Sequence, residues 1–413
     1  MVVLFVAVGG AVAVLLANSP HNISHPNVEF TIPTTTAAAA PPKKKSFVWP
    51  WYGYDAGRTR VFTAGNTPAP PLRVGWRFQD YALLEFPPVI YGNSLYVMDD
   101  DASAKELDGK TGHKVWETKV GTLAAASPAL GAKQGLLYLP VLSAHGHSPG
   151  GGRFVALSMK TGRTAWSKAI PAGTESSPIV DGNSVYFGDQ GGHVYSLDAT
   201  TGRTNWTFHA SAPVKGGPAI ANGIVYFGDY SGRAYAVNAA TGHQVWAVST
   251  DGAHFGFGSG NFYSTPAVAF GRVYMGNTDG RVYSFAAKTG KLAWATGTGA
   301  YVYASAAVND TPGLGPTVYL GSYDGNFYAF NAQSGAIRWK HRAGGKISGS
   351  ATIVGDVVYY SDLGSKTTAG LDVRTGHQVF SFPDGAFNPV VADNGAIYLS
   401  GYTMLYQMLP KHH

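Results

Sequence analysis

The sequence predicts an all-β protein, an eight-bladed β-propeller of four-stranded antiparallel blades, and three observations lead to this prediction. The motif Thr-Gly-x-x-x-Trp, with close variants, recurs along the 413 residues at intervals of 40 to 50 residues. Charged residues make up 13% of the chain, against about 25% in typical domains, whereas Gly (54), Tyr (24) and Phe (20) are abundant, as expected for short strands joined by tight turns. The chain also exceeds the usual length of a single core, so a unit repeated around a shared centre is expected.

Each repeat contains segments that are typical of four short strands. In the clearest copy, the apolar run at residues 176–180 is followed by SVYFG at 184–188 and HVYSLD at 193–198, and a TTG turn then leads to Trp206. Glycine in the turns supplies backbone angles that other residues adopt only at a cost. Periods of this length with four strands each are typical of propeller blades.

One aromatic residue marks the outer strand of each repeat. The eight anchors are Trp76, Trp116, Trp166, Trp206, Trp246, Trp294, Trp339 and Phe380. An aromatic side chain buries about 150–250 Å² in a folded protein, which is more than a single small sheet can cover. We therefore expect each anchor to pack between neighbouring blades.

The two ends of the repeat region complete each other. Eight segments begin an inner strand, and their first residues are Glu85, Ala125, Glu175, Lys215, Tyr263, Tyr303, Ile347 and Ala386. The last repeat never reaches a Thr-Gly-Trp segment, whereas Trp76 is an outer-strand anchor without inner strands before it. The N- and C-terminal strands are thus predicted to pair in one blade and close the ring, with seven blades as the alternative count.

Three further regions are expected before the propeller at residues 76–413. Residues 2–17 are uncharged and mostly apolar, near the length that spans a bilayer, so residues 1–17 are interpreted as a signal anchor or a signal peptide. Residues 18–46 are rich in Thr, Ala and Pro and are expected to be a disordered linker. Residues 47–75 are expected to cap the propeller. This order predicts a protein attached to a membrane, with the propeller on the extracytoplasmic side.

Composition excludes several classes of function. The chain has no cysteine, which excludes disulfides, thiolate metal sites and thiol catalysis. Its only dense basic run is at residues 43–45, so nucleic-acid binding is not expected. His145 and His147 are interpreted as the tip of an exposed hairpin in preference to a metal site, because no carboxylate or cysteine accompanies them. No catalytic or metal-binding residue is predicted, and the protein is expected to be a monomer.

Five polar or aromatic residues are candidates for a funnel on the propeller axis. The residue three positions before the Pro of each inner strand should approach the axis, which selects Glu85, Glu175, Lys215, Tyr263 and Tyr303. Such a ring could orient a polar ligand or a cation. Alternatively, Glu175 and Lys215 form an ion pair between adjacent blades.

The longest excursion between strands, residues 251–265, contains four glycines and several aromatic residues. Loops on a rigid scaffold commonly carry recognition, so Phe255, Phe257 and Phe262 are candidates for contact with a partner. The alternative is that these side chains plug the mouth of the channel.

The repeat pattern VYFGDxxGxxYxLDAxTGxxxW, best seen at residues 185–206, resembles the PQQ-like, or quinoprotein-type, β-propeller repeat. This superfamily includes eight-bladed quinoprotein dehydrogenases and non-enzymatic BamB-like assembly factors. WPWYGYDAGRTR, at residues 49–60, is similar to the segment that precedes the first blade of the dehydrogenases. The resemblance implies that this segment crosses or caps the propeller.

The resemblance also implies two functions. In the dehydrogenases PQQ and calcium lie on the propeller axis, but the adjacent cysteines found in many of them are absent here, and no Asn and Asp pair for calcium and base is placed. We therefore expect a non-enzymatic binding, scaffold or assembly protein without a cofactor, whose partner is a protein or polymer. The alternative is a PQQ- and calcium-dependent oxidoreductase that uses the axial funnel.

Overall fold

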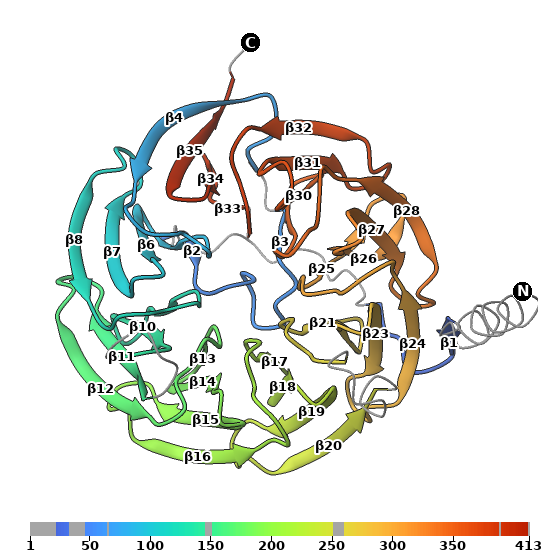
Figure 1. Cartoon of the computed structure of the whole chain (residues 1–413), viewed down its shortest axis with the longest axis horizontal. Helices are drawn as coiled ribbons and strands as arrows, with labels where there is room; N and C mark the ends of the chain where they lie inside the picture. Colours follow the sequence, from blue (N-terminus) through green and yellow to red (C-terminus); the bar gives the residue numbers. More distant parts are fainter. Residues whose placement is uncertain are drawn as a thin grey trace, which may run out of the picture.

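Eight antiparallel sheets surround a central axis in the computed structural model, which describes residues 22–32, 46–63, 66–144, 151–250, 260–387 and 390–411. Figure 1 shows the closed wheel viewed along this axis. Seven sheets each have four strands that follow each other along the chain, and the eighth has three C-terminal strands and β4 (Leu72–Gln79). Three sheets also have a fifth short strand from the N-terminal region. The predicted all-β, eight-bladed propeller is confirmed.

Blades 1 to 4 follow each other along the chain. Their strands are β5 (Val89–Tyr91), β6 (Ser94–Met98), β7 (Ser103–Asp108) and β8 (Lys114–Lys119); β9 (Ala129–Gly131), β10 (Leu136–Val141), β11 (Gly152–Ser158) and β12 (Thr164–Ile170); β13 (Ile179–Asp181), β14 (Ser184–Gly188), β15 (His193–Asp198) and β16 (Thr204–His209); β17 (Ala219–Ala221), β18 (Ile224–Gly228), β19 (Arg233–Asn238) and β20 (Gln244–Ser249).

Blades 5 to 8 complete the ring. Their strands are β21 (Ala267–Ala269), β22 (Arg272–Gly276), β23 (Arg281–Ala286) and β24 (Leu292–Gly297); β25 (Ala307–Thr311), β26 (Gly315–Gly321), β27 (Asn326–Asn331) and β28 (Ile337–Arg342); β29 (Thr352–Val354), β30 (Val357–Ser361), β31 (Thr368–Asp372) and β32 (Gln378–Phe382); β33 (Val390–Ala392), β34 (Ile397–Ser400), β35 (Met404–Pro410) and β4 (Leu72–Gln79). The added strands are β1 (Ile23–Ser24) on β24, β2 (Val48–Trp49) on β5 and β3 (Val61–Phe62) on β29.

Burial follows from the position of a strand in its blade. The second and third strands lie between two neighbouring sheets, so β14 and β15 are buried along nearly their whole length. The outer strand β16 alternates between half-buried and exposed residues, because only one of its faces meets the next blade. The apolar runs in the sequence are therefore the inner strands of each blade.

Each tryptophan anchor docks on the next blade in the same way. The indole Nε1 of Trp166 donates a hydrogen bond to the Ala199 carbonyl at 3.1 Å, and the ring lies against Gly202 of the Thr-Gly turn. The anchors Trp76, Trp116, Trp206, Trp246, Trp294 and Trp339 make the corresponding hydrogen bond at 2.9–3.2 Å. The recurring Trp and the recurring Gly are thus the two halves of one contact between blades.

Phe380 marks the one junction where this contact changes. Blade 8 closes with strands from both ends of the chain, so it has no Thr-Gly turn between its third and fourth strands. The outer strand of blade 7 carries Phe380 at the anchor position, and its side chain has no hydrogen-bond donor. The buried Tyr359 hydroxyl beside it has no hydrogen-bond partner among the described residues. The departure from Trp at this position follows from ring closure.

Ring closure joins the two ends as predicted. The strand β35 pairs antiparallel with β4 from Met404 opposite Gln79 to Pro410 opposite Leu72. At the end of β4, the Lys105 ammonium of blade 1 lies 2.8 Å from an Asp80 carboxylate oxygen and also contacts Asp99, with all three side chains buried. Removing Lys105 would leave two buried carboxylates without their cation, and loss of a partner from a buried ion pair typically costs about 3–5 kcal/mol.

The linker prediction is wrong for residues 22–32. These residues dock on blade 5, where β1 pairs with β24 and Val28 enters the core beside Trp294. The sequence contains few large apolar residues here, but the exposed edge of β24 offers backbone partners that compensate. The disorder expected at residues 33–45 lies outside the described residues. The outer strand β4 begins at Leu72, within the range predicted as the cap. In the described part of the chain, no helix has the length and apolarity needed to cross a bilayer.

We predict that Gly202→Ala destabilises the propeller more than Gly223→Ala. Both glycines have φ near +73°, so both substitutions carry the same backbone cost, but a Cβ at Gly202 would lie 2.6 Å from the Trp166 ring and a Cβ at Gly223 would meet nothing. Overpacking of this kind costs about 1–3 kcal/mol. Urea unfolding of the full chain should show this difference in the free energy of unfolding. Equal losses for the two variants would contradict the docking contact.

Candidate functional site

One end of the central channel is closed by residues 46–63, the region for which a capping role was expected. The segment pairs with β5 through β2 and runs parallel to β29 through β3. Between these strands its backbone carbonyls accept hydrogen bonds at 2.7–2.9 Å from the innermost strands of four other blades. The donor and acceptor pairs are Leu130 to Pro50, Ile220 to Ala56, Val268 to Gly57 and Val308 to Thr59. The segment therefore satisfies strand edges that would otherwise face the channel.

A buried arginine fixes this cap to blades 3 and 4. The Arg58 guanidinium donates hydrogen bonds to the carbonyls of Ser177, Pro178 and Pro218 at 2.9–3.0 Å. Its complete burial and the nearby Arg60 lower the pKa of Arg58 to about 9. The Arg60 guanidinium lies 4.4 Å from the centre of the Tyr52 ring. Both arginines thus hold Tyr52 at the inner face of the cap.

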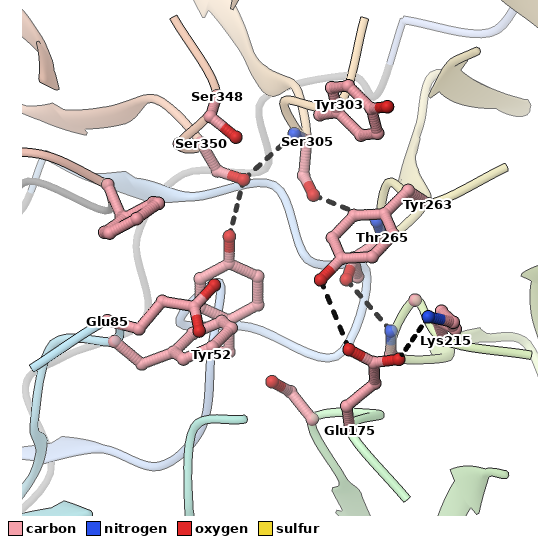
Figure 2. A pocket seen from close by; sticks show the side chains of 16 residues that line it. Tyr52, Glu85, Glu175, Lys215, Tyr263, Thr265, Tyr303, Ser305, Ser348 and Ser350 are labelled. Atoms are coloured by element: carbon pink, nitrogen blue, oxygen red, sulfur yellow. Dashed lines mark hydrogen bonds and ion pairs between the residues drawn. The ribbon is translucent and has the colours of Figure 1, made fainter. Parts of the chain in front are cut away.

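A small axial cavity lies between Tyr52 and the opposite face of the propeller. Its volume is about 50 Å³, and its floor is Tyr52, whose hydroxyl donates a 2.5 Å hydrogen bond to Ser350. Figure 2 shows the side chains around it. The five predicted funnel residues all line this cavity: Glu85, Glu175, Lys215, Tyr263 and Tyr303.

Glu175 is held by partners from three blades. The Lys215 ammonium of blade 4 lies 2.8 Å from Glu175 Oε1, so the ion pair considered from the sequence is present. Gln190 donates to the same oxygen at 3.0 Å, and the Tyr263 hydroxyl of blade 5 donates to Oε2 at 3.4 Å. Lys215 also lies 4.8 Å from the centre of the Tyr230 ring. The carboxylate and the ammonium are therefore largely committed to each other.

Glu85 has a different electrostatic environment. Burial, with smaller contributions from the nearby carboxylates Asp100 and Glu175, raises the pKa of its carboxyl group to about 8. Burial likewise raises the pKa of Tyr263 well above its ordinary value. The cavity thus contains one committed ion pair and one carboxyl group that is predominantly protonated near neutral pH.

A ring of hydroxyl groups around the cavity was not found in the sequence analysis. The backbone N–H groups of Ser127, Gly217, Thr265 and Ser305 each donate to a hydroxyl of the following blade at 2.9–3.1 Å. The acceptors are Ser177, Thr265, Ser305 and Ser350. These hydroxyl residues stand directly before the Pro position of their repeats, so the recurring Ser or Thr at that position was the available signal. These hydrogen bonds join blade 2 to blade 3, and join blades 4, 5, 6 and 7 in succession, close to the axis.

The structure corrects two of the sequence interpretations. Ile347 packs against Gly321 in the core, and Ser348 lines the cavity in its place, because this repeat has no proline from which its register could be read. Phe262 is fully buried between blades 4 and 5 against Gly228, so it neither contacts a partner nor plugs the mouth. Phe255, Phe257, His145 and His147 lie outside the described residues.

The cavity does not fit the cofactor that the resemblance implied. Small-molecule sites typically enclose about 300–1,000 Å³, far more than the space above Tyr52. Calcium takes about six to eight oxygen ligands, whereas within the described ranges no three or more His, Asp and Glu side chains are grouped to hold a metal ion. The space is sufficient for a few water molecules or for one small polar group.

Comparison with protein families gives one match along most of the chain. The model of the family described as outer membrane protein assembly factor BamB matches residues 72–189, 126–298 and 304–404. No curated protein matches the sequence significantly.

Solved structures show the same fold at low sequence identity. BamB from Moraxella catarrhalis is 18% identical with a TM-score of 0.66, over 83% of this chain and 99% of that chain. A europium-containing methanol dehydrogenase is 14% identical with a TM-score of 0.70, over 88% and 98%. Quinohemoprotein alcohol dehydrogenase from Comamonas testosteroni is 14% identical with a TM-score of 0.68, over 89% and 81%. These structures establish the fold, which enzymes and an assembly factor share.

We predict that Glu85 makes the stability of the propeller fall as the pH rises. Its pKa is about 8 in the folded protein and 4.5 in a model peptide, so the folded state binds the proton more tightly between these values. The stabilisation from protonated Glu85 is therefore complete below pH 4.5 and is lost by about pH 8. Between these values the free energy of unfolding falls by at most about 1.4 kcal/mol per pH unit. Urea unfolding at about pH 5 and pH 8 should show a smaller loss for Glu85→Gln than for the natural chain. Glu29→Gln, at an exposed position, is the charge control, and equal slopes for Glu85→Gln and the natural chain would contradict the prediction.

Proposed function

The chain belongs to the family described as outer membrane protein assembly factor BamB, and from this premise we propose that it is a non-enzymatic propeller that binds a protein partner. Its place is the extracytoplasmic side of a membrane, where it acts as a monomeric scaffold or assembly protein. It needs no cofactor for this role.

The observation that carries the proposal is the small size of the axial cavity, which the cap closes at one end. The cap fills one end of the channel with Tyr52 and its arginines, and about 50 Å³ remains above it. A cofactor with several fused rings needs a larger cleft, whereas one side chain from a partner needs only a small polar pocket. A protein surface laid across the open end of the channel can supply such a side chain.

The open face also carries aromatic residues that suit protein contacts. Tyr81 is fully exposed on the connection between β4 and β5, which also contains Glu85. Tyr402 is 47% exposed, and its carbonyl accepts a hydrogen bond from Leu84 on that connection. Tyrosine is enriched at protein interfaces, because it offers a large apolar area and one hydroxyl group. The proposed contact face therefore includes the rim of blades 8 and 1.

The N-terminal sequence supports the proposed location. Residues 2–17 are mostly apolar and uncharged, as expected for a signal anchor, and only residues 18–21 separate them from the docked residues 22–32. Anchoring through this segment places the propeller next to the membrane that holds it.

A PQQ- and calcium-dependent oxidoreductase is the second candidate function. It is favoured by one observation, the close structural likeness to the two dehydrogenases over most of their length. In this chain Glu175 would be the axial carboxylate available for such a role. The cavity would have to enlarge before the cofactor entered.

We predict that the purified full chain shows no saturable binding of PQQ with Ca²⁺ and no dye-linked oxidation of alcohols or sugars. A photocrosslinking residue at Tyr81 or Tyr402 should instead capture the same envelope protein in cells. The control position is Val245 on the outer strand of blade 4, which is 48% exposed and lies away from the axial face.

Two outcomes would decide against the proposal. PQQ-dependent turnover that is lost in Glu175→Gln would establish the oxidoreductase. Crosslinks at Val245 equal to those at Tyr81 and Tyr402 would contradict a partner site on the axial face.

A further inference from the structure

Residues 22–32 form a docked segment on one side of the wheel, which Figure 1 shows beside β24. Ile23 and Ser24 pair with Ala295 and Trp294, and the N–H of His25 donates to the Ala293 carbonyl at 2.6 Å. Blade 5 is thus the only one of the described blades whose outer strand is covered by another strand.

The docked segment also contacts blade 6 and the core. The Ser24 hydroxyl donates to the Ser334 carbonyl at 2.8 Å, and the Gln333 amide donates to the Pro26 carbonyl at 3.2 Å. The buried Arg272 guanidinium donates to the carbonyls of Val28 and Glu29. Backbone pairing, side-chain hydrogen bonds and the burial of Val28 together fix the segment to the propeller.

The position of Asn22 limits where the preceding chain can lie. Its side-chain oxygen accepts a hydrogen bond at 3.0 Å from the N–H of Gly297, at the end of β24 that leads to Tyr301 and the axial face. Only residues 18–21 separate Asn22 from the apolar run that ends at Ala17. An extended chain spans at most about 3.6 Å per residue, so Ala17 lies within about 18 Å of Asn22.

The neighbouring outer strand β28 is the most cationic in the ring. It carries Arg338, Lys340 and Arg342 and no carboxylate, whereas each other outer strand carries at most two cations. Lys346 follows on the same rim, and the ion pairs found among the described residues include none of Lys340, Arg342 and Lys346.

The carboxylate of Asp324, whose backbone carbonyl contacts Arg342, is turned toward the protein. Asp324 accepts hydrogen bonds from the N–H of Gly299 at 2.9 Å and from the Tyr328 hydroxyl at 2.5 Å. Tyr301 on this rim is 48% exposed, and tyrosine and lysine are the residues that suit the headgroup layer of a bilayer.

We propose that the rim of blades 5 and 6 rests against an anionic lipid surface, held there by docked residues 22–32 and attracted by the cations of β28. The proposal rests on the membrane anchoring proposed above. The propeller then meets the membrane at its edge, with the rim of blades 8 and 1 on the far side of the wheel (Figure 1) and open to a partner. Each cation near such a surface raises membrane affinity about five-fold, and the attraction falls off within a Debye length of about 8 Å.

The test uses the absence of cysteine, which makes single-cysteine labels specific. A donor fluorophore is placed at Tyr301→Cys or at Tyr81→Cys in the full chain, which is reconstituted in phosphatidylcholine vesicles with or without phosphatidylglycerol and with an acceptor on the headgroups. Both positions lie on connections of the axial face, and blades 6, 7 and 8 separate them around the ring. We expect strong energy transfer at position 301 and weak transfer at position 81 when phosphatidylglycerol is present.

Charge reversal separates the two parts of the proposal. Lys340→Glu with Arg342→Glu should lower the transfer at position 301 in phosphatidylglycerol vesicles to the value in neutral vesicles. Lys114→Glu with Lys119→Glu, on the outer strand of blade 1, makes the same change of charge on the far side and should have no effect.

The remaining outcomes are distinguishable. Sedimentation with vesicles but equal transfer from positions 301 and 81 would overturn the rim contact and leave the anchoring intact. A full chain that does not sediment with vesicles would overturn the anchoring and the rim contact together. Transfer could also differ between positions 301 and 81 but change neither with lipid charge nor with charge reversal. This outcome would overturn the role of β28, because the short segment between the apolar run and Asn22 would then alone set the distance of the label from the vesicle surface.

Discussion

The structure depends above all on the contact between a tryptophan and the Thr-Gly turn of the next blade. A single four-stranded sheet cannot cover its outer aromatic residue, so each blade is incomplete until its neighbour provides the turn and the carbonyl that accepts the indole N–H. Burial of such a side chain contributes up to about 4–6 kcal/mol, as an upper bound. Every junction except that between blades 7 and 8 has this contact, so the ring gains its full stability only when β4 and β35 close it. The buried charges of Lys105, Asp80 and Asp99 lie at the end of this strand pair, where they join β4 to blade 1.

Closure of the ring creates a second requirement at the axis, where eight inner strands would present unpaired backbone groups to the channel. The cap provides hydrogen-bond partners for these groups through the backbone carbonyls of residues 46–63 and the Arg58 side chain. Gly217 shows how closely the two parts are matched, because a Cβ there would lie 2.5 Å from the Ser177 carbonyl that accepts from Arg58. The hydroxyl ring therefore has glycine at the point where the arginine enters. The small volume of the axial cavity is a consequence of this cap.

The sequence was sufficient to predict the elements that repeat. The number of blades, the eight anchors and the pairing of the chain ends all follow from the spacing of Trp, Gly and Pro, because the same local physics is repeated in every blade. The predictions were wrong where the structure depends on a contact that occurs at one place only and is not repeated in every blade. Residues 22–32 look like a linker until the edge of β24 supplies hydrogen bonds, and Phe262 looks like a loop residue until Gly228 makes room for it. Ile347 was placed one residue out of register because its repeat lacks the proline used for alignment. The hydroxyl ring was visible in the sequence, but its partners lie in adjacent blades.

Departures from the repeat are therefore the most informative positions of this fold. Identical blades present identical faces, so a ring with perfect repetition could not distinguish one side from another. Here the Glu175–Lys215 pair and Tyr263 occupy one sector of the axis, and Glu85 lies across from them. On the circumference, one outer strand is covered by the chain's own N-terminal residues and its neighbour carries three cations. The inner strands and the tryptophan contacts do not require these departures for packing. They are instead the positions at which the proposed partner and the proposed charged surface would distinguish one side of the ring from another.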